Sequence, residues 1–370
     1  SDAIRPAYDR LLPPPPIVGM KHMPLRLSYA PYRLLFKHPF ETSHGVRDGT
    51  DSIFIRLDEH GLVGYGEVTL PPYLEEKPRA VIDRLLRIER SHLVDPETCL
   101  AHLNEENAWG KHEQGCRAGL YSAWIDLVCR IQQVSVAQML SIENMKHALT
   151  MVTIGITPVA EVKSVLQDLP KSDVLKVKMN GPGSIPMLKA VLQADPRPVF
   201  LDANQGLSSS NEAEQLLREA DKRLVAIEQP FNLNNNELQR KFQEGMNTVV
   251  YGDESIRGLS DLELAKGWFK GVNIKLMKCG GLDRAKAMAE KAHALGMNVM
   301  LGSMSESSLG CTAMAHLAGW SDLIDLDGPW LIKNDPFEGM DLRNGELAMP
   351  NRPGIGAIKK AELDFIPICT

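Results

Sequence analysis

Leu175-Lys176-Val177-Lys178 is the first of several runs in which apolar residues lead to a charged one; the others are Leu201-Asp202-Ala203-Asn204, Ile227-Glu228-Gln229-Pro230, Tyr251-Gly252-Asp253-Glu254 and Asn273-Ile274-Lys275. Their charged residues Lys178, Asp202, Glu228, Asp253 and Lys275 are separated by 24, 26, 25 and 22 residues. Such a spacing fits one strand, one helix and their loops. The series therefore predicts a parallel β/α barrel with these side chains gathered at the carboxyl ends of its strands.

The apolar pattern from residue 147 onward extends this prediction to a whole barrel. We expect eight strands, at Met151–Ile156, Val174–Met179, Val199–Ala203, Leu224–Ile227, Thr248–Tyr251, Val272–Leu276, Asn298–Leu301 and Leu323–Leu326. Amphipathic segments between them predict helices, for example at Asn211–Ala220, Leu262–Lys266 and Arg284–Leu295. The predicted fold class is α/β, a (β/α)7-8 TIM-type barrel over residues 147–334 that lacks a final helix.

The preceding part of the chain predicts a second domain, an α+β capping domain over residues 23–146. Two strands are expected at Ser52–Leu57 and Leu62–Val68, joined by a turn at Asp58–Gly61. Two helices are expected, one from Lys77 with Val81, Leu85, Leu86 and Ile88 on one face, and one at Ala118–Ile131.

The two ends of the chain lack a clear period. Residues 1–22 contain the polyproline run Pro13–Pro16, and we expect an extended tail there rather than a docking motif. Residues 335–370 are expected to pack back against the capping domain.

The composition is that of an ordinary globular protein. The 370 residues are 44% hydrophobic and 24% charged, with a formal net charge of −6. This charge provides no electrostatic reason for a nucleic acid or an anionic membrane as partner, and no apolar run approaches 18 residues. Six scattered cysteines (Cys99, Cys116, Cys129, Cys279, Cys311 and Cys369) are expected to be free thiols in a reducing compartment. A cytoplasmic protein is expected; because the chain begins Ser1-Asp2, an exported form stays open.

The charged strand ends predict a particular chemistry. Three carboxylates from separate strands suit a hard cation such as Mg²⁺, with Mn²⁺ as an alternative, and the absence of cysteine or histidine there disfavours zinc. Removing the proton alpha to a carboxylate creates an enediolate, whose charge the metal would stabilise. Lys178 and Lys275 lie across the barrel from each other and could address opposite faces of one carbon, which predicts racemisation or epimerisation. Lys176 is expected to face away from Lys178 unless the strand is irregular.

With these motifs, the chain resembles the enolase superfamily and, within it, the muconate-lactonising-enzyme subgroup. Lys176-Val177-Lys178 matches the Lys-x-Lys of the second strand, and Asn273 to Gly281 matches the sixth-strand base motif. The resemblance implies Asp202, Glu228 and Asp253 as metal ligands, with Asn204 and Glu254 supporting them. It implies Lys178 and Lys275 as the bases, assisted electrostatically by Lys176. Lys278 is expected to be a surface charge.

The resemblance also separates branches of the superfamily. The mandelate-racemase-like branch uses a histidine at the seventh strand end, where this chain has Gly302-Ser-Met-Ser-Glu306, so that branch is disfavoured. At the eighth strand end, Asp325-Leu326-Asp327 resembles the dipeptide epimerases, in which such a pair holds the α-ammonium of the substrate. Two carboxylates would also repel a dianion. The structural alternative is that Asp325 caps a turn and Asp327 is solvated.

The expected reaction is Mg²⁺-dependent epimerisation of a dipeptide at its C-terminal residue, with recycling of cell-wall peptides as the family's usual context. The alternatives are an N-acyl amino acid racemase, an o-succinylbenzoate synthase or a muconate-type cycloisomerase using the same site, or a barrel that binds without turnover. A homo-oligomer stays possible.

Specificity depends on the capping domain and on the seventh strand end. Arg47, in the loop Phe40–Arg47, could hold a glutamate side chain as in L-Ala-D/L-Glu epimerases, or could be a surface charge. Ser303, Met304 and Glu306 are expected at the pocket, with a place behind it as the alternative for Glu306. Gly64–Glu67 and Pro71–Tyr73 are interpreted as a hairpin end and a turn.

Overall fold

The computed structural model describes residues 24–42, 45–105, 107–142 and 148–368. The predicted tail and Cys369 lie outside this part of the chain. The other five cysteines are buried and unpaired, in accord with the expectation of free thiols. No helix in the described ranges is long and apolar enough to cross a membrane.

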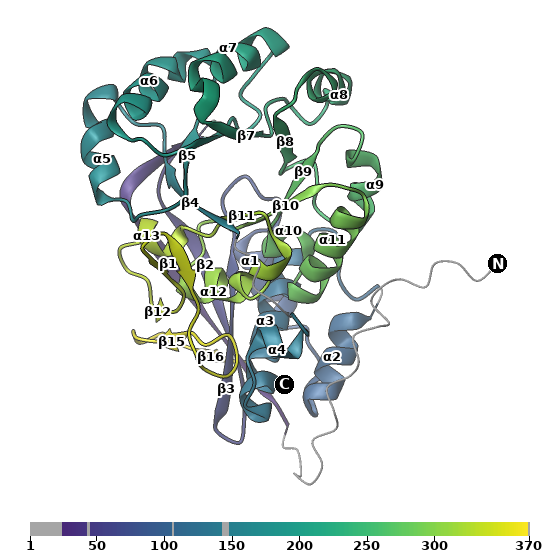
Figure 1. Cartoon of the computed structure of the whole chain (residues 1–370). Coiled ribbons are helices and arrows are strands. Elements are labelled where there is room, and N and C mark those ends of the chain that lie inside the picture. The colour runs from purple at the N-terminus through teal and green to yellow at the C-terminus, as the bar shows by residue number, and fades with distance from the viewer. Residues whose placement is uncertain (1–23, 43–44, 106, 143–147, 369–370) are drawn as a thin grey trace, which may run out of the picture.

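Eight parallel strands close into a barrel, which confirms the predicted fold (Figure 1). They are β4 (Leu149–Ile154), β5 (Val174–Lys178), β6 (Val199–Asp202), β7 (Leu224–Glu228), β8 (Val249–Gly252), β9 (Gly271–Ile274), β10 (Asn298–Gly302) and β11 (Leu323–Asp325). Each overlaps its predicted strand because uninterrupted apolar runs are typical of strands buried on both faces. After β11 only the short helix α13 (Gly328–Leu331) follows, so the barrel lacks a full final helix.

Helices surround the barrel as the amphipathic segments predict. The principal ones are α5 (Val162–Asp168), α6 (Ile185–Ala194), α7 (Ser210–Ala220), α8 (Asn236–Gly245), α9 (Leu262–Ala265), α11 (Leu282–Ala294) and α12 (Ser308–Ala315), and α10 (Leu276–Cys279) is a single turn. In α7, the Ser209 hydroxyl accepts from the Glu212 amide at the start, and Ala213, Leu216 and Ala220 form the buried face.

The capping domain is a sheet in the order β16-β1-β2-β3 covered by helices. Its strands are β1 (Arg26–Thr42), β2 (Gly45–Glu59), β3 (Leu62–Thr69) and β16 (Ile366–Pro367), and its helices are α1 (Pro78–Leu85), α2 (Pro96–Asn104), α3 (Gln114–Gln132) and α4 (Val136–Met139). The hairpin turns at His60 and Gly61, both with positive φ. Gly66 lets β3 approach α3: a Cβ there would lie 1.9 Å from the carbonyl oxygen of Gly119.

Three details of this domain differ from the sequence prediction. Strand β2 begins seven residues before Ser52, since it pairs with the full length of β1. Helix α3 begins at Gln114 rather than Ala118. Leu86 is 51% exposed because it follows Leu85 directly and so lies off the helix face that Val81 and Leu85 bury.

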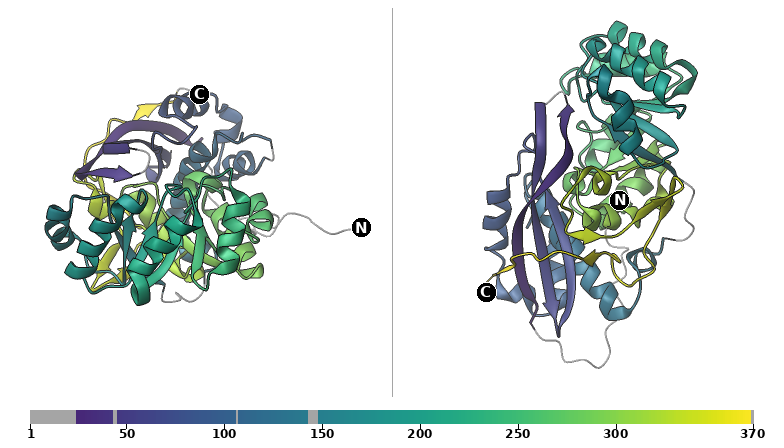
Figure 2. Two further views of the ribbon diagram at one scale, coloured as in Figure 1. Left: turned by 90° about the horizontal axis from the view of Figure 1, so that it is seen from above. Right: turned by 90° about the vertical axis from the view of Figure 1, so that its left-hand side faces the viewer.

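The C-terminal segment forms two short ladders, β12 (Phe337–Glu338) with β15 (Ile358–Lys359) and β13 (Asp341–Arg343) with β14 (Glu346–Ala348). It then returns to the capping sheet, where β16 pairs with β1. Figure 2 shows β1 and β2 running beside the barrel, so that the capping domain lies along one side of it.

Candidate active site

The barrel interior explains why the charged residues converge. Seven residues form an apolar layer inside it: Met151, Val174, Phe200, Ala226, Tyr251, Met300 and Leu323. Side chains two residues apart in a strand share a face. The residues that follow this layer by two positions therefore also point inward, toward the carboxyl end of the barrel. They include Lys176, Asp202, Glu228, Asp253 and Asp325.

The same period corrects the expectation that Lys176 faces away from Lys178. Lys176 and Lys178 both face the interior, because they are two and four residues beyond Val174 on β5. The Lys176 ammonium lies 3.0 Å from Asp202 Oδ2, and the Lys178 ammonium lies 2.5 Å from the same oxygen. No irregularity of the strand is needed to bring both lysines into the site.

Lys176 is at the centre of the charged cluster. Its Nζ lies 2.7 Å from Glu228 Oε2 and 2.6 Å from Asp325 Oδ2, in addition to its contact with Asp202. Burial disfavours its charge, but the surrounding carboxylates hold the pKa of Lys176 well above its usual value. Its place between three carboxylates suits Lys176 to an electrostatic role.

The opposite wall is built around Asp253. Its Oδ2 accepts from Lys275 Nζ at 2.7 Å, and its Oδ1 accepts from Lys278 Nζ at 2.6 Å. The prediction that Lys278 is a surface charge is wrong. The chain turns into α10 after Lys275, which carries Lys278 back beneath the strand ends, where its ammonium also donates to the carbonyl oxygen of Asn273. The sequence feature that could have indicated the burial of Lys278 is its position three residues after the strand-end lysine Lys275.

Amide side chains hold the carboxylates in place. Asn273 Nδ2 donates to Glu228 Oε1 at 2.6 Å. Gln229 Oε1 accepts from the backbone amide of Asp253 at 3.0 Å, which ties the ends of β7 and β8 together. Asn204 Oδ1 accepts from Lys178 Nζ at 3.2 Å, whereas Glu254 lies half-buried directly after Asp253. Asn273 and Gln229 were part of the quoted motifs, but sequence reasoning assigned them no role.

The carboxylates at the strand ends are close enough to affect one another's ionisation. Burial, followed by the charges of Asp202 and Asp253, raises the pKa of Glu228 to about 8, although Lys176 and Lys275 oppose this shift. The three carboxylates that the resemblance implies as ligands, Asp202, Glu228 and Asp253, are all buried. They suit a hard divalent ion such as Mg²⁺, which prefers oxygen ligands. These residues therefore fit the metal that the resemblance implies.

Asp325 and Asp327 border the same pocket as the lysines. Both are buried, and Asp327 Oδ2 accepts from the backbone amide of Thr153 at 2.6 Å. Burial and the charge of Asp325 raise the pKa of Asp327 to about 6. The alternative that Asp327 is solvated is wrong, since Asp327 is buried just after β11. A cationic group beside Asp327 would stabilise its charge.

The pocket also includes residues from the capping domain. Arg47 and Tyr73 line it, with the Arg47 guanidinium carbon 5.8 Å from the Tyr73 ring centre. The Nη1 of Arg47 is buried and has no hydrogen-bond partner among the described residues. Tyr73 thus belongs to the pocket rather than only to a turn, and its hydroxyl lies 3.7 Å from the sulfur of Met304.

The seventh strand end contributes Ser303 and Met304 to the pocket. Glu306 does not line it; its Oε2 accepts from the Met304 amide at 2.6 Å and holds this loop from behind. Burial, with the charge of Glu67, raises the pKa of Glu306 to about 8.

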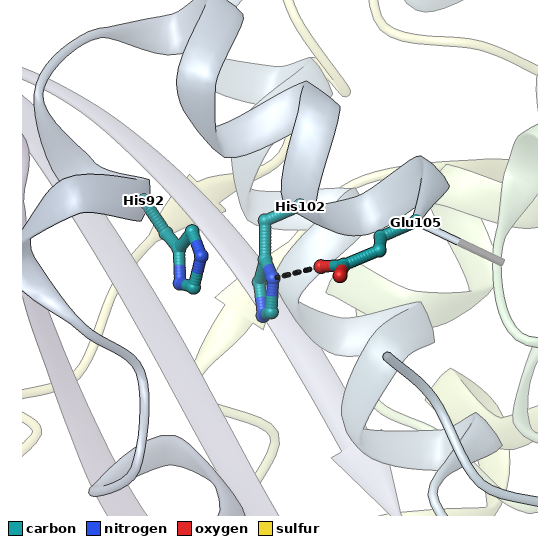
Figure 3. A group of neighbouring side chains, drawn as sticks. All are labelled: His92, His102 and Glu105. Carbon is teal, nitrogen blue, oxygen red and sulfur yellow. Dashed lines mark ion pairs between the residues drawn. The ribbon is translucent and has the colours of Figure 1, made fainter. Parts of the chain in front are cut away.

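A separate group of potential metal ligands, His92, His102 and Glu105, lies in the capping domain (Figure 3). The rings of the two histidines are stacked with centres 3.9 Å apart, so their nitrogen lone pairs do not converge. The guanidinium of Arg84, which can only donate, lies 3.3 Å from His102 Nε2 and therefore occupies its lone pair. This arrangement does not fit a divalent ion.

Comparison with known proteins agrees with the fold. The family model described as enolase C-terminal domain-like matches residues 161–362. An L-Ala-D/L-Glu epimerase of Bacteroides thetaiotaomicron is 31% identical over 90% of this chain and 88% of its own. The chain therefore belongs to the enolase C-terminal domain-like family of the enolase superfamily. It is an isomerase of the epimerase and racemase class.

Two solved structures match over nearly their whole length. A dipeptide epimerase of Cytophaga hutchinsonii, complexed with Mg and D-Ala-L-Val, has a TM-score of 0.82 at 22% identity, covering 95% of this chain and 100% of that one, and shows the shared fold. A dipeptide epimerase of Enterococcus faecalis, complexed with Mg and L-Leu-L-Tyr, has a TM-score of 0.78 at 25% identity, covering 91% and 99%.

Proposed function

We propose that this protein epimerises dipeptides at the α-carbon of the C-terminal residue. The observation that carries the proposal is the buried pair Asp325 and Asp327 in the pocket that also contains Lys178 and Lys275. One part of this pocket suits an ammonium, and the other suits proton transfer at a carbon. Relatives named as epimerases of L-Ala-D/L-Glu and of hydrophobic dipeptides support the proposal.

Asp202, Glu228 and Asp253 would hold one Mg²⁺ ion, as the bound Mg in the related dipeptide epimerase structures supports. When bound, it would stabilise the negative charge that develops on the substrate carboxylate as the α-proton leaves. Lys178 and Lys275 stand on β5 and directly after β9, on different sides of the barrel. One lysine removes the proton, and the other returns a proton to the opposite face of the carbon.

The side chain of the C-terminal residue is proposed to be acidic. Arg47 reaches the pocket with a buried Nη1 that has no partner in the described part of the chain. Burial lowers the pKa of Arg47, so a carboxylate beside it would be stabilising. This favours a glutamate or aspartate side chain over the surface-charge interpretation of Arg47.

The first experiment follows the α-proton by NMR in D₂O, with Mg²⁺ and a panel of L,L-dipeptides that includes L-Ala-L-Glu. We expect the C-terminal α-proton signal to disappear as the diastereomer accumulates. No exchange with any dipeptide would contradict the proposal and would favour a cycloisomerase.

A second comparison tests the ammonium site. Asp327→Asn should reduce kcat/KM for L-Ala-L-Glu roughly 10–100-fold, the size of a hydrogen bond to a charged group. It should affect the N-acetylated peptide much less, because that substrate has no ammonium. Asp327 is chosen over Asp325 because Asp325 also contacts Lys176. Exposed Asp364 provides the control variant, Asp364→Asn. Equal or better turnover of the acetylated peptide by the unaltered protein would instead indicate an N-acyl amino acid racemase.

A further inference from the structure

A larger cavity opens beside the candidate active site. Its volume is about 250 Å³, compared with about 50 Å³ for the site pocket itself. Thr153 and Leu331 line both, so the two spaces adjoin at the carboxyl end of β4. The elements around this cavity (β1, β4, α5 and α13) lie on one side of the barrel in Figure 1.

The walls of the larger cavity are mostly apolar. Its aliphatic and aromatic residues come from the capping strands, the end of β4, α5 and α13, and include Phe36, Val46, Ile156, Val165, Leu169 and Trp330. Val46 is 64% exposed although it lines this space. The charged residues at the cavity, among them Lys37, Glu161 and Asp168, are of both signs. The lining is thus suited to an uncharged, apolar group rather than to a second ion.

The position of the Asp325–Asp327 pair indicates what that group is. Thr153, whose amide donates to Asp327, forms the boundary between the two spaces. A substrate ammonium held by the pair would place the N-terminal α-carbon at this boundary. The site pocket is the smaller of the two spaces, and the adjoining cavity offers more room for a large side chain.

We propose that the larger cavity receives the side chain of the N-terminal residue, and that the enzyme prefers a bulky aliphatic or aromatic residue there to alanine. This inference rests on the proposed dipeptide epimerisation. Because one methylene in an apolar pocket can change kcat/KM by roughly 10–200-fold, a leucine should exceed alanine by at least about tenfold.

The test measures kcat/KM for L-Leu-L-Glu, L-Phe-L-Glu and L-Ala-L-Glu by α-proton exchange in D₂O with Mg²⁺. Val165→Trp fills the cavity from α5 and should bring the leucine-to-alanine ratio close to one. Val159→Trp is the matched control: it is a valine six residues earlier, 53% exposed and not in the cavity wall, and it should leave the ratio unchanged. Trp330→Ala removes a wall of the same cavity and should also lower the ratio.

A ratio near one in the unaltered protein, or a ratio that Val165→Trp does not change, would overturn the inference. Turnover of L-Ala-L-Glu without a preference for leucine would do so while leaving the proposed reaction intact. If none of the three peptides exchanged its α-proton, the proposed reaction would be contradicted, and the inference that rests on it would be contradicted as well.

Discussion

The ammonium of Lys278 lies 2.6 Å from Oδ1 of Asp253, beneath the charged end of the barrel. It also donates to the carbonyl oxygens of Asp253 and Asn273, at 2.7 and 2.8 Å. Three acceptors around one buried ammonium leave it a single orientation. Lys278 thereby holds the Asp253 carboxylate with its other oxygen facing Lys275.

Replacing Lys278 with methionine should weaken Mg²⁺ binding more than it affects the fold. The variant keeps the volume of the side chain but releases Asp253, one of the three proposed ligands. Loss of a residue that orients a ligand typically reduces metal affinity 10–100-fold. Calorimetric titration with Mg²⁺ measures this directly. Lys189→Met, at a half-exposed lysine that pairs with Glu219, should bind Mg²⁺ unchanged. Equal affinities in the two variants would show that Lys278 has no positioning role.

Alanine at Lys178 or at Lys275 should separate proton exchange from epimerisation. Each variant should lose epimerisation in both directions by about 10²–10⁴-fold, since inversion requires a base on each face. Each should still exchange the α-proton of one diastereomer, because one lysine remains. NMR in D₂O, starting from L,L- and L,D-dipeptides in separate samples, measures both rates. Epimerisation that survives either substitution would exclude the two-base mechanism.

Glu67 should be needed for stability because it joins the capping domain to the barrel. Its carboxylate accepts from the Ser307 amide at 2.8 Å, the Ser307 hydroxyl at 2.5 Å and the Gly310 amide at 3.0 Å, around the start of α12. In Glu67→Gln an amide nitrogen would face donors, which should reduce the free energy of unfolding by roughly 2–3 kcal/mol. Urea unfolding provides the measurement. Glu362→Gln, at a side chain that is 96% exposed, should have no such effect.

His316 should make the folded state sensitive to acid. The Nε2–H donates to the Ile355 carbonyl oxygen at 3.0 Å, and Nδ1 accepts from the Ala137 amide at 3.3 Å, so the buried ring is neutral. Burial lowers its pKa from 6.5 to about 4. Between these values the unfolded chain binds the extra proton, so stability falls as the pH decreases from about 6.5 toward 4, by on the order of 3 kcal/mol.

Urea unfolding at several pH values between 4 and 7 checks this expectation. His316→Gln should flatten the dependence on pH in that window, whatever its stability at pH 7. His293→Gln, at an exposed histidine, should keep the original slope. The same slope in all three proteins would show that His316 does not titrate with folding.

The sequence alone was sufficient for the barrel and for five of the charged residues at its strand ends. A strand that is buried on both faces has an uninterrupted apolar sequence, and each β/α unit has a nearly constant length. Both features can therefore be recognised in short stretches of the sequence. Lys178, Asp202, Glu228, Asp253 and Lys275 could therefore be placed at strand ends from spacing, and the motifs around them indicated the superfamily.

Tertiary structure decided the contacts that depend on how separate segments meet. Lys278 is buried because α10 turns it under the strand ends, Tyr73 and Arg47 reach the pocket because the capping sheet lies beside the barrel, and Glu67 is enclosed by α12. None of these contacts follows from a periodic pattern, since each joins residues whose distance apart depends on the docking of two domains or on a loop's path. The larger cavity, which adjoins the site pocket at Thr153, has the same origin, so the proposed preference for the N-terminal residue depends on the assembled fold.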